Sequence, residues 1–362
     1  MRAVARKGGI QTQANPPVRL MIIDDSLVAR TALKRIVEGD SGMEVIAVVN
    51  TAEAGLELLR SVSTDVILLD LEMPGMGGLK ALPKIVARAP HARILVVSSF
   101  TVDGADQTLE ALSQGAAAAL PKPDAVSFTN GYRDMLLERI RSVAAGVASR
   151  PAAPAPPVIR ARPPSLKPVH ALGIGASTGG IHALMRFFAG LKGPANVPIF
   201  ITQHLPGAFM PAFARQLTVA SGYEAIIAED EMPVRPGRIH IAPGHAHMMF
   251  RNLAGRTIVR LDTTPQSSGC TPSVDPMFAA MAQEYGGHAL GVMLSGMGRD
   301  GSQGAAQIVT AGGSIYAQDE ASCAVWGMPR AVAEAGLASA VLPPEEIASR
   351  VSTSMGSRHG SE

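Results

Sequence analysis

The sequence predicts an α/β protein with two domains, each built on a mostly parallel sheet. Short apolar runs alternate with segments of helical periodicity from Val18 onward, and this alternation resumes after His170. Between them, residues 144–168 include the stretch ASRPAAPAPPVIRARPPSLKP, which has many prolines and no acidic residue. Such a segment is extended and cannot bury a core, so it marks a domain boundary. A length of 362 residues also exceeds what one compact core usually spans.

The predicted elements divide the chain into five parts. We expect a disordered extension over 1–17, a first domain over 18–140, a linker over 141–168, a second domain over 169–352 and a disordered tail over 353–362. Strands of the first domain are expected at 18–23, 43–49, 66–69, 94–97 and 116–120. Strands of the second domain are expected at 170–175, 197–203, 224–228, 238–242, 289–294 and 314–317, with a hairpin over 248–261.

The composition excludes several classes of protein. Hydrophobic residues make up 47% and charged residues 17%, which is typical of a globular protein. A net charge of +2 gives no general case for nucleic-acid binding. Cys270 and Cys323 are too few for a disulfide framework or a cysteine-based zinc site, so a reducing cytoplasm is expected. No apolar run is long enough to cross a bilayer, and the basic N-terminus lacks the apolar segment of a secretory signal.

Polar side chains follow the predicted strands of the first domain. Asp24 and Asp25 end the first strand, Asp70 the third, Ser98 the fourth and Lys122 the fifth. In an open parallel sheet these ends meet at one edge, where ligands bind. Three carboxylates favour a hard cation such as Mg²⁺, and a lysine with a hydroxyl suits phosphate oxygens. Helix capping would explain any one of these aspartates, but it does not explain all five positions together.

This region resembles the receiver domain of two-component response regulators. The matching motifs are Ile23-Asp-Asp-Ser26, Leu69-Asp-Leu-Glu-Met-Pro74, Val97-Ser-Ser99 and Pro121-Lys-Pro123. The resemblance implies a flavodoxin-like fold, Asp70 as acceptor of a phosphoryl group from a chemotaxis histidine kinase, and phosphoryl contacts from Ser98 and Lys122. It also implies Mg²⁺ bound by Asp24, Asp25, Asp70 and the backbone carbonyl of Glu72. Two positions depart from the family pattern: Gly77 stands where an Asp is frequent, and Ala119 stands where a switching aromatic is frequent.

The stretch GIGASTGG, Gly173–Gly180, has two interpretations. It is a variant of the dinucleotide-binding turn, and it also contains G-x-S-x-G, a turn that exposes a nucleophilic serine. A dinucleotide site needs an acidic residue at the end of the next strand, but that strand ends in Gln203-His204. His204 can instead serve as the base that a serine nucleophile requires, which favours Ser177 as a nucleophile. A serine that merely caps a helix is the alternative.

A third group must orient the imidazole, and backbone N–H groups must stabilise an oxyanion. Asp300 is the first candidate for the orienting carboxylate, Asp275 the second and Asp262 the third. The loop at Gly296–Gly298 and the helix start at Thr178–Gly180 can supply the N–H groups. The chain order Ser, His, Asp differs from that of the α/β-hydrolase fold, so the G-x-S-x-G motif does not indicate that fold.

The second domain resembles the catalytic domain of the chemotaxis protein-glutamate methylesterases. The motifs are Gly173–Gly180, Gln203-His204, Ile241-Ala-Pro-Gly244, Pro272-Ser-Val-Asp275, Leu294–Gly301 and Gly327-Met-Pro-Arg330. The resemblance implies a doubly wound, mostly parallel domain with Ser177 as nucleophile, His204 as base, Asp300 as orienting carboxylate and Met297, with Thr178, at the oxyanion hole.

The same resemblance implies an activity and its control. It predicts a cytoplasmic, phosphorylation-regulated hydrolase, without an esterase cofactor, that demethylates glutamate γ-methyl esters on chemoreceptor cytoplasmic domains. Many members of the family also deamidate receptor glutamines, and the sequence leaves open whether this chain does so. We expect a monomer that binds no nucleic acid and does not insert into the membrane, in which the unphosphorylated receiver packs over the catalytic cleft. The rival functions are a non-catalytic signalling adaptor and an NAD-dependent enzyme.

Three further histidines and one cysteine are better explained by structure than by catalysis or metal binding. The spacing of His240, His245 and His247 suggests a metal site, but that stretch offers no carboxylate or cysteine partner, so hairpin or edge positions explain the three residues. His247 matches a histidine that recurs in the family and is expected to border the site. Cys270 is expected at the rim of the site, without a catalytic role.

Overall fold

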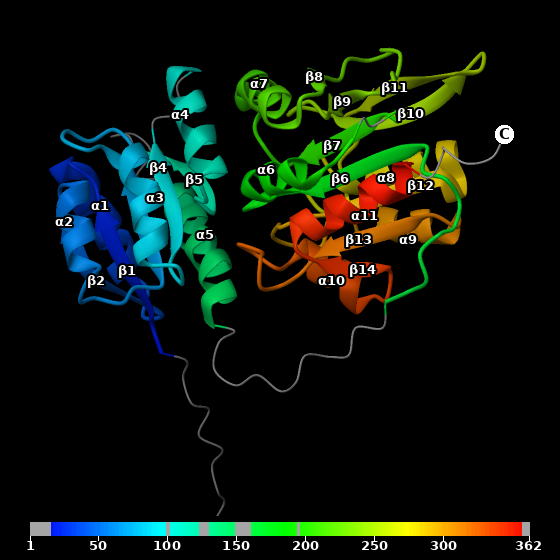
Figure 1. The fold of residues 1–362 in the computed structure, drawn as a ribbon. Coiled ribbons are helices and arrows are strands. Elements are labelled where there is room, and N and C mark those ends of the chain that lie inside the picture. The colour runs from blue at the N-terminus through cyan, green and yellow to red at the C-terminus, as the bar shows by residue number, and fades with distance from the viewer. Residues whose placement is uncertain (1–15, 99–101, 123–129, 149–160, 194–195, 357–362) are drawn as a thin grey trace, which may run out of the picture.

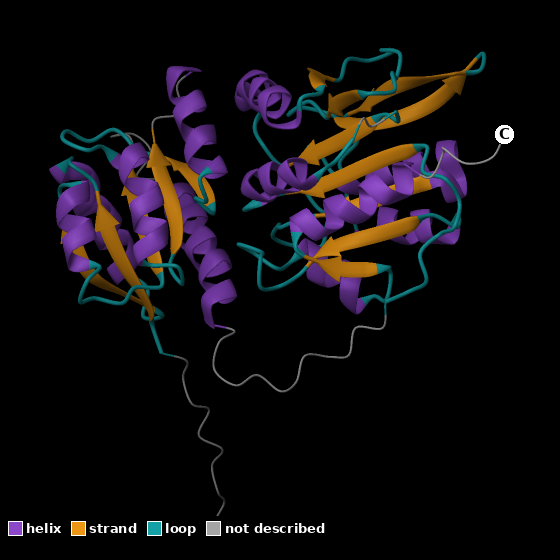
Figure 2. Ribbon diagram, in the orientation of Figure 1, coloured by secondary structure: helices purple, strands orange, loops and turns teal. Residues whose placement is uncertain are grey.

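A computed structural model describes residues 16–98, 102–122, 130–148, 161–193 and 196–356. It contains two α/β domains that lie side by side (Figure 1), each with helices on both faces of a sheet (Figure 2). Most of the predicted N-terminal extension, the centre of the predicted linker and the end of the predicted tail lie outside the described residues. Among the helices that the structure describes, none combines the length and the apolar character that a bilayer crossing requires.

The first domain has a five-stranded parallel sheet in the order β2-β1-β3-β4-β5, which is the predicted flavodoxin-like order. The central strand β3 is buried along its whole length because helices cover both of its faces. The strands are β1 (Val18–Ile23), β2 (Met43–Val49), β3 (Val66–Asp70), β4 (Arg93–Ser98) and β5 (Ala118–Pro121). The helices are α1 (Leu27–Glu38), α2 (Ala52–Leu58), α3 (Gly78–Arg88), α4 (Val102–Ser113) and α5 (Asn130–Ala148).

Two predicted boundaries are wrong. Helix α5 continues to Ala148, beyond the predicted domain end at residue 140, because Val143 and Ala144 extend its buried face. Helix α11 (Pro344–Gly356) likewise runs into the segment predicted as a disordered tail, because Ile347 and Val351 are buried at helical spacing. The end of the predicted linker also has fixed contacts: the Ser165 N–H donates to Ser314 Oγ at 2.7 Å.

The second domain has a seven-stranded parallel sheet in the order β14-β13-β12-β6-β7-β9-β8. The predicted hairpin, β10–β11, forms a separate two-stranded antiparallel sheet. The strands are β6 (Ala171–Ala176), β7 (Ile199–Gln203), β8 (Glu224–Ile227), β9 (Arg238–Ile241), β10 (His247–Leu253), β11 (Arg256–Asp262), β12 (Ala289–Met293), β13 (Ser314–Gln318) and β14 (Ala340–Leu342). The helices are α6 (Gly180–Gly190), η1 (Gly207–Phe209), α7 (Met210–Ser221), α8 (Val274–Tyr285), η2 (Gly286–His288), α9 (Ser302–Thr310), α10 (Met328–Glu334) and α11.

The core of the second domain lies in two layers, one on each face of the sheet. Phe187 of α6 belongs to one apolar cluster, together with residues of α7 and α11. Phe278 of α8 belongs to the other, together with residues of α9, α10 and the hairpin. Strand β6 lies between β7 and β12, so the chain direction of the crossovers reverses there. Such a switch point leaves a crevice at the carboxyl ends of the strands, which is where ligands bind in open α/β sheets.

The two domains pack against each other through α4, α5 and the β5 edge of the first domain. Helix α4 contacts α6, η1 and α7 of the second domain. His182 Nδ1 of α6 donates to the Ser113 carbonyl at 2.7 Å, and Arg93 donates to the Cys323 carbonyl at 3.1 Å. Val325 of the second domain packs in the same apolar cluster as Ile140 of α5. The interface therefore combines apolar burial with directed hydrogen bonds.

We predict that Phe187→Ala destabilises the second domain by about 3–5 kcal/mol, because it removes a fully buried aromatic ring. Trp326 is the only tryptophan in the chain and lies in this domain, so its fluorescence during urea unfolding reports on the change. The control is Val219→Ala on α7, where the side chain is 86% exposed and the expected change is below about 0.5 kcal/mol. Equal midpoints for the two variants would contradict this assignment of the core.

Candidate functional site

Ser177 lies directly after β6, in the turn that leads into α6. The Ser177 N–H donates to the Ser295 carbonyl at 3.0 Å, and Gln203 Nε2 donates to the Ser177 carbonyl at 2.9 Å. Gly179 has φ of +75°, in the left-handed region, and a Cβ there would lie 2.8 Å from Ser295 Oγ. Only glycine fits such a position without strain. The glycines of GIGASTGG therefore permit a turn that neighbouring strands hold rigidly.

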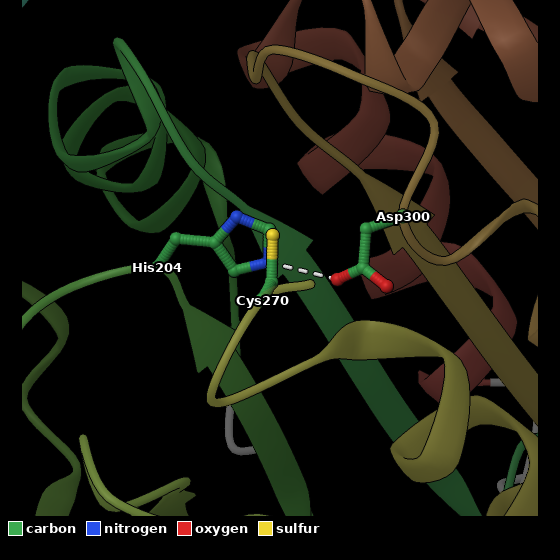
Figure 3. A group of neighbouring side chains, drawn as sticks. All are labelled: His204, Cys270 and Asp300. Atoms are coloured by element: carbon green, nitrogen blue, oxygen red, sulfur yellow. Dashed lines mark hydrogen bonds and ion pairs between the residues drawn. The ribbon is translucent and has the colours of Figure 1, made fainter. Parts of the chain in front are cut away.

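The structure brings Ser177, His204 and Asp300 together at the switch point. His204 follows β7, and Asp300 lies in the loop after β12. His204 Nδ1 is 3.1 Å from Ser177 Oγ. On the other side of the ring, His204 Nε2 is 2.8 Å from Asp300 Oδ2, the contact dashed in Figure 3. These distances place hydroxyl, imidazole and carboxylate in one hydrogen-bonded line. Of the three predicted candidates for the carboxylate, the first is the one that contacts the imidazole.

Asp300 is itself held by the start of helix α8. Ser273 Oγ donates to Asp300 Oδ1 at 2.6 Å, and the Val274 N–H donates to Asp300 Oδ2 at 2.7 Å. Buried His247 accepts the Ser273 N–H at Nδ1, at 2.9 Å, and its Nε2 donates to the Thr264 carbonyl at 3.1 Å. His247 thus borders the site as expected. The role of Ser273 was not predicted, although its place in the Pro-Ser-Val-Asp motif was a signal.

The charges of this line are set by competing effects. Burial lowers the pKa of His204, but its hydrogen bonds to Asp300 and Cys270 raise that pKa, with a net value of about 9. Burial raises the pKa of Asp300, but the hydrogen bonds from His204 and Ser273 hold it below its usual value. Asp300 is therefore ionised and the imidazolium is stabilised.

This arrangement suits nucleophilic chemistry at Ser177. In its neutral form, with its proton on Nε2, His204 can accept the Ser177 proton at Nδ1 while Asp300 fixes the ring. Because its pKa is about 9, the share of this neutral form grows as the pH rises toward 9. In the described part of the chain, the N–H groups of Thr178 and Met297 take no part in the backbone hydrogen bonds of the two loops. Gly296 approaches so closely that a Cβ there would lie 2.9 Å from Ser177 Cβ. Both N–H groups thus belong to loops beside the Ser177 hydroxyl. A donor to an oxyanion formed at Ser177 has to lie in such a position.

Ser177 and His204 line a cavity of about 370 Å³ between the two domains. Its other walls include Met297 of the second domain and Ala119 and Arg139 of the first. Arg139 of α5 donates to Thr178 Oγ1 at 3.0 Å, and the Gly179 N–H donates to the Ala117 carbonyl at 2.8 Å. The first domain therefore touches the turn that bears the hydroxyl.

The other candidates of the second domain have different partners. Asp275 accepts the Gly304 N–H at 2.8 Å and so caps α9, and Asp262 accepts the Thr264 N–H at 3.0 Å. Burial lowers the pKa of His240 to about 4, and its Nε2 accepts the Arg235 N–H at 3.4 Å. Within the described ranges, the clusters of three potential metal ligands do not include His240, His245 or His247.

Cys270 is half-buried and lines the cavity beside Ser177. Its Sγ, a ring nitrogen of His204 and a carboxylate oxygen of Asp300 lie within 4.8 Å of one another. Figure 3 shows the three side chains converging, with Cys270 on the loop that precedes α8. The sequence could not place this sulfur, because a loop rather than a strand end carries it.

The predicted carboxylates of the first domain also converge. Oxygens of Asp24, Asp25 and Asp70 lie within 4.8 Å of one another, and Lys122 Nζ is 2.7 Å from Asp70 Oδ2. The Glu72 N–H donates to Asp70 Oδ1 at 3.0 Å. Burial raises the pKa of Asp70 to about 6, although Lys122 and the Glu72 N–H act in the opposite direction.

These residues fit a hard divalent cation. Asp24 Oδ2 is buried and has no hydrogen-bond partner among the described residues, which is costly unless a cation satisfies it. Ser98 Oγ, at the end of β4, is buried and likewise lacks a partner in the described part of the chain. Both oxygens are therefore available to a bound group, and oxygen ligands are those that Mg²⁺ prefers.

The two departures from the family pattern have local consequences. Gly77 has φ of +72° at the start of α3, a conformation that favours glycine. Ala119 is half-buried and lines the cavity beside Ser177, so its small side chain helps to leave that cavity open.

The fold and the two sites define a two-domain α/β protein that combines a carboxylate pocket with a serine–histidine–aspartate site. Residues 20–128 match the family model of the response regulator receiver domain, and residues 172–351 match that of the CheB methylesterase. The chain belongs to the CheB methylesterase family, with an N-terminal receiver domain.

Relatives of similar length support this membership. The protein-glutamate methylesterase/protein-glutamine glutaminase of Azospirillum brasilense is 41% identical over 358 residues, 91% of each chain. Protein-glutamate methylesterase/protein-glutamine glutaminase 2 of Caulobacter vibrioides is 44% identical and covers 91% of this chain and 96% of its own. The crystal structure of the Thermotoga maritima CheB methylesterase catalytic domain matches with a TM-score of 0.50 at 34% identity, covering 51% of this chain and 98% of that one.

We predict that the His204 imidazole titrates with a midpoint near 9 and that Asp300→Asn moves this midpoint down. The anionic carboxylate stabilises the imidazolium, so without it the effect of burial dominates. Side-chain NMR of the full chain measures the midpoint, with the signal assigned by its loss in His204→Gln. Asp275→Asn is the matched control, because that carboxyl binds Gly304 instead. An unchanged or higher midpoint in Asp300→Asn would refute this electrostatic account.

Proposed function

We propose that this chain is a phosphorylation-regulated serine hydrolase that cleaves glutamate γ-methyl esters on chemoreceptors. The observation that carries the proposal is the line Ser177–His204–Asp300, with distances of 3.1 and 2.8 Å. The names of the relatives include protein-glutamine glutaminase, so we propose glutamine deamidation as a second activity of the same site. The substrates are methylated cytoplasmic domains of receptors, which places the enzyme in the cytoplasm and in chemotactic adaptation.

The reaction proceeds in two stages at Ser177. Its Oγ attacks the ester carbonyl while His204 Nδ1 takes the hydroxyl proton, and the N–H groups of Met297 and Thr178 stabilise the oxyanion. The tetrahedral intermediate collapses, and methanol leaves with the proton from the imidazolium. Water then attacks the acyl-enzyme with His204 as base, which frees glutamate and restores the Ser177 hydroxyl. Asp300 orients the ring and stabilises its charged form throughout.

Two rivals are less well supported. A dinucleotide enzyme needs a carboxylate after β7, and the residue there is His204. A non-catalytic adaptor does not need a buried carboxylate with a support network behind its histidine, yet Ser273, Val274 and His247 provide one. The adaptor predicts no methanol release, which the first experiment below tests.

The carboxylate pocket is proposed to receive the phosphoryl group at Asp70. Asp24, Asp25, Asp70 and the Glu72 carbonyl would hold Mg²⁺, which would neutralise charge on the transferred group. Lys122 is already 2.7 Å from Asp70, and Ser98 Oγ is buried without a partner among the described residues, so both would contact the phosphoryl oxygens. A chemotaxis histidine kinase is the proposed donor.

The contact between the domains supports control of the esterase by the receiver. The receiver forms part of the wall of the cavity of about 370 Å³ that contains Ser177. A receptor helix with side chains is about 10–12 Å across, so the docked receiver restricts its approach to Ser177. The hydrogen bonds from Arg139 to Thr178 and from Gly179 to Ala117 hold this docked arrangement. Phosphorylation at Asp70 is proposed to weaken the contact and to admit the substrate.

We predict that Ser177→Ala lowers methanol release from methylated receptor by at least about 10³-fold, because it removes the hydroxyl that forms the acyl-enzyme. Ser267→Ala is the matched control, since Ser267 is exposed and its hydroxyl accepts a hydrogen bond from Gln303, at 3.4 Å. The assay measures methanol released from receptor-containing membranes by the full-length protein. Full activity in Ser177→Ala would exclude the proposed nucleophile, and no activity in the unmodified chain would favour the adaptor.

We predict that Arg139→Ala raises the methanol-release rate of the unphosphorylated protein several-fold, because it removes a bond that holds the receiver over the Thr178 turn. Arg133→Ala is the control: Arg133 lies on the same helix but is exposed and contacts Gly39. A small-molecule phosphodonor should activate the unmodified chain and Arg133→Ala, and it should not activate Asp70→Asn. Lower or unchanged basal activity in Arg139→Ala would count against inhibition by this contact.

A further inference from the structure

Three side chains of different ligand types meet at the base of the catalytic line. The Cys270 sulfur, a His204 nitrogen and an Asp300 oxygen lie within 4.8 Å of one another (Figure 3). Thiolate, imidazole and carboxylate are the ligands that Zn²⁺ uses in proteins. The proposed esterase chemistry requires His204 and Asp300, but it gives Cys270 no task.

We propose that Cys270, His204 and Asp300 form a binding site for a thiophilic divalent cation, Zn²⁺ or Cd²⁺, whose occupation switches the esterase off. The binding part stands on the geometry of the three side chains alone. The inhibitory part rests on the proposed function, because it requires His204 to act as a base.

The geometry needs only small movements to accommodate the ion. Zn²⁺ lies about 2.0–2.3 Å from nitrogen, oxygen and sulfur ligands, which places neighbouring ligand atoms about 3.3–3.8 Å apart in a tetrahedron. His204 Nε2 and Asp300 Oδ2, now 2.8 Å apart, would separate by about 0.5 Å. Three protein ligands leave the fourth position to water, as at other open zinc sites.

The surroundings supply an outer shell and an access path. Ser273 Oγ and the Val274 N–H already orient the Asp300 carboxylate. Such outer hydrogen bonds are a regular feature of metal sites. Cys270 is half-buried and lines both the cavity beside Ser177 and a second cavity next to Asp300, so a hydrated ion can reach the sulfur from solvent.

Binding at this position removes the base from the reaction. The cation takes the lone pair of His204 Nε2, and the Cys270 thiol releases its proton to solvent as its sulfur becomes a ligand. The imidazole proton then resides on Nδ1, which faces Ser177 Oγ at 3.1 Å. A ring with its proton on Nδ1 donates to the serine and cannot accept its proton, so the nucleophile is no longer activated.

The second cysteine provides an internal comparison. Cys323 is buried, and burial raises the pKa of its thiol. It belongs to neither cluster of three potential metal ligands found within the described ranges. Deleting the Cys323 sulfur therefore removes a thiol from the chain without touching the proposed site.

The direct test is Cd²⁺ titration of the full-length protein, with the thiolate-to-cadmium ultraviolet band as readout. Excess Mg²⁺ in all samples occupies the receiver carboxylates. We expect one equivalent of band-forming Cd²⁺ for the unmodified chain and for Cys323→Ala, and no band for Cys270→Ala or Cys270→Ser. Trp326 fluorescence during urea unfolding checks that each variant is folded. No band in the unmodified chain, or a band that persists in folded Cys270 variants, would overturn the site.

The second test measures Zn²⁺ inhibition of methanol release, relative to each variant's own rate with a chelator. We expect the half-inhibiting Zn²⁺ concentration to rise more than about tenfold in Cys270→Ala and to stay unchanged in Cys323→Ala. A cadmium band without zinc inhibition would confirm binding and overturn the switch. Loss of activity with chelator would also overturn the switch, because the metal would then assist catalysis. A chain with no esterase activity but a cadmium band would refute only the proposed function.

Discussion

The parallel pairing of β6 with β7 and β12 is the constraint on which the catalytic site depends. In this register Ala176 lies opposite Gln203, and Gly175 lies opposite Met293. The three strands therefore end at one level, and the residues that follow them face a common crevice. Ser177, His204 and Asp300 need no long side chains to meet, because the backbone has already brought them together. A shift of one residue in any pairing would turn a side chain to the opposite face of the sheet.

The receiver applies the same construction to a different chemistry. Its strand ends carry carboxylates and a lysine, so the pocket concentrates charge where burial is costly. Burial raises the pKa of Asp70 to about 6, and the ion pair with Lys122 only partly offsets this. At the catalytic site, by contrast, one buried carboxylate has three hydrogen-bond donors and stays ionised. The same edge of a parallel sheet thus supports two kinds of site. The Asp70 pocket needs an added cation to balance its charge, whereas the donors around Asp300 all come from the protein.

Features set by strand ends could be predicted from the sequence, and features set by loops could not. Ser177 and His204 directly follow apolar runs, and Asp300 follows one within a short loop, so the sequence predicts that all three meet at one edge of the sheet. Ser273 and Cys270 reach the same site from a loop before α8, whose path depends on packing against the hairpin and leaves no periodic signal. The ends of α5 and α11 were misjudged for a related reason. The buried stripes of these helices continue to Val143 and Val351, and single buried residues of this kind are a weak signal for where a helix ends.

Strand β5 gives the proposed regulation a physical basis. Its far end leads into Lys122, which contacts Asp70, and its near end follows Ala117, whose carbonyl accepts the Gly179 N–H. One short edge strand, paired with β4, thus touches both the carboxylate pocket around Asp70 and the turn that carries Ser177. Because Ala119 on this strand has no large side chain to rotate, a rotamer change at that position cannot carry the proposed signal. Displacement of the strand backbone, with the α4 and α5 surfaces beside it, is the remaining route by which a new charge on Asp70 can reach Ser177. The hydrogen bond to Gly179 is the first point at which the catalytic domain would register that displacement.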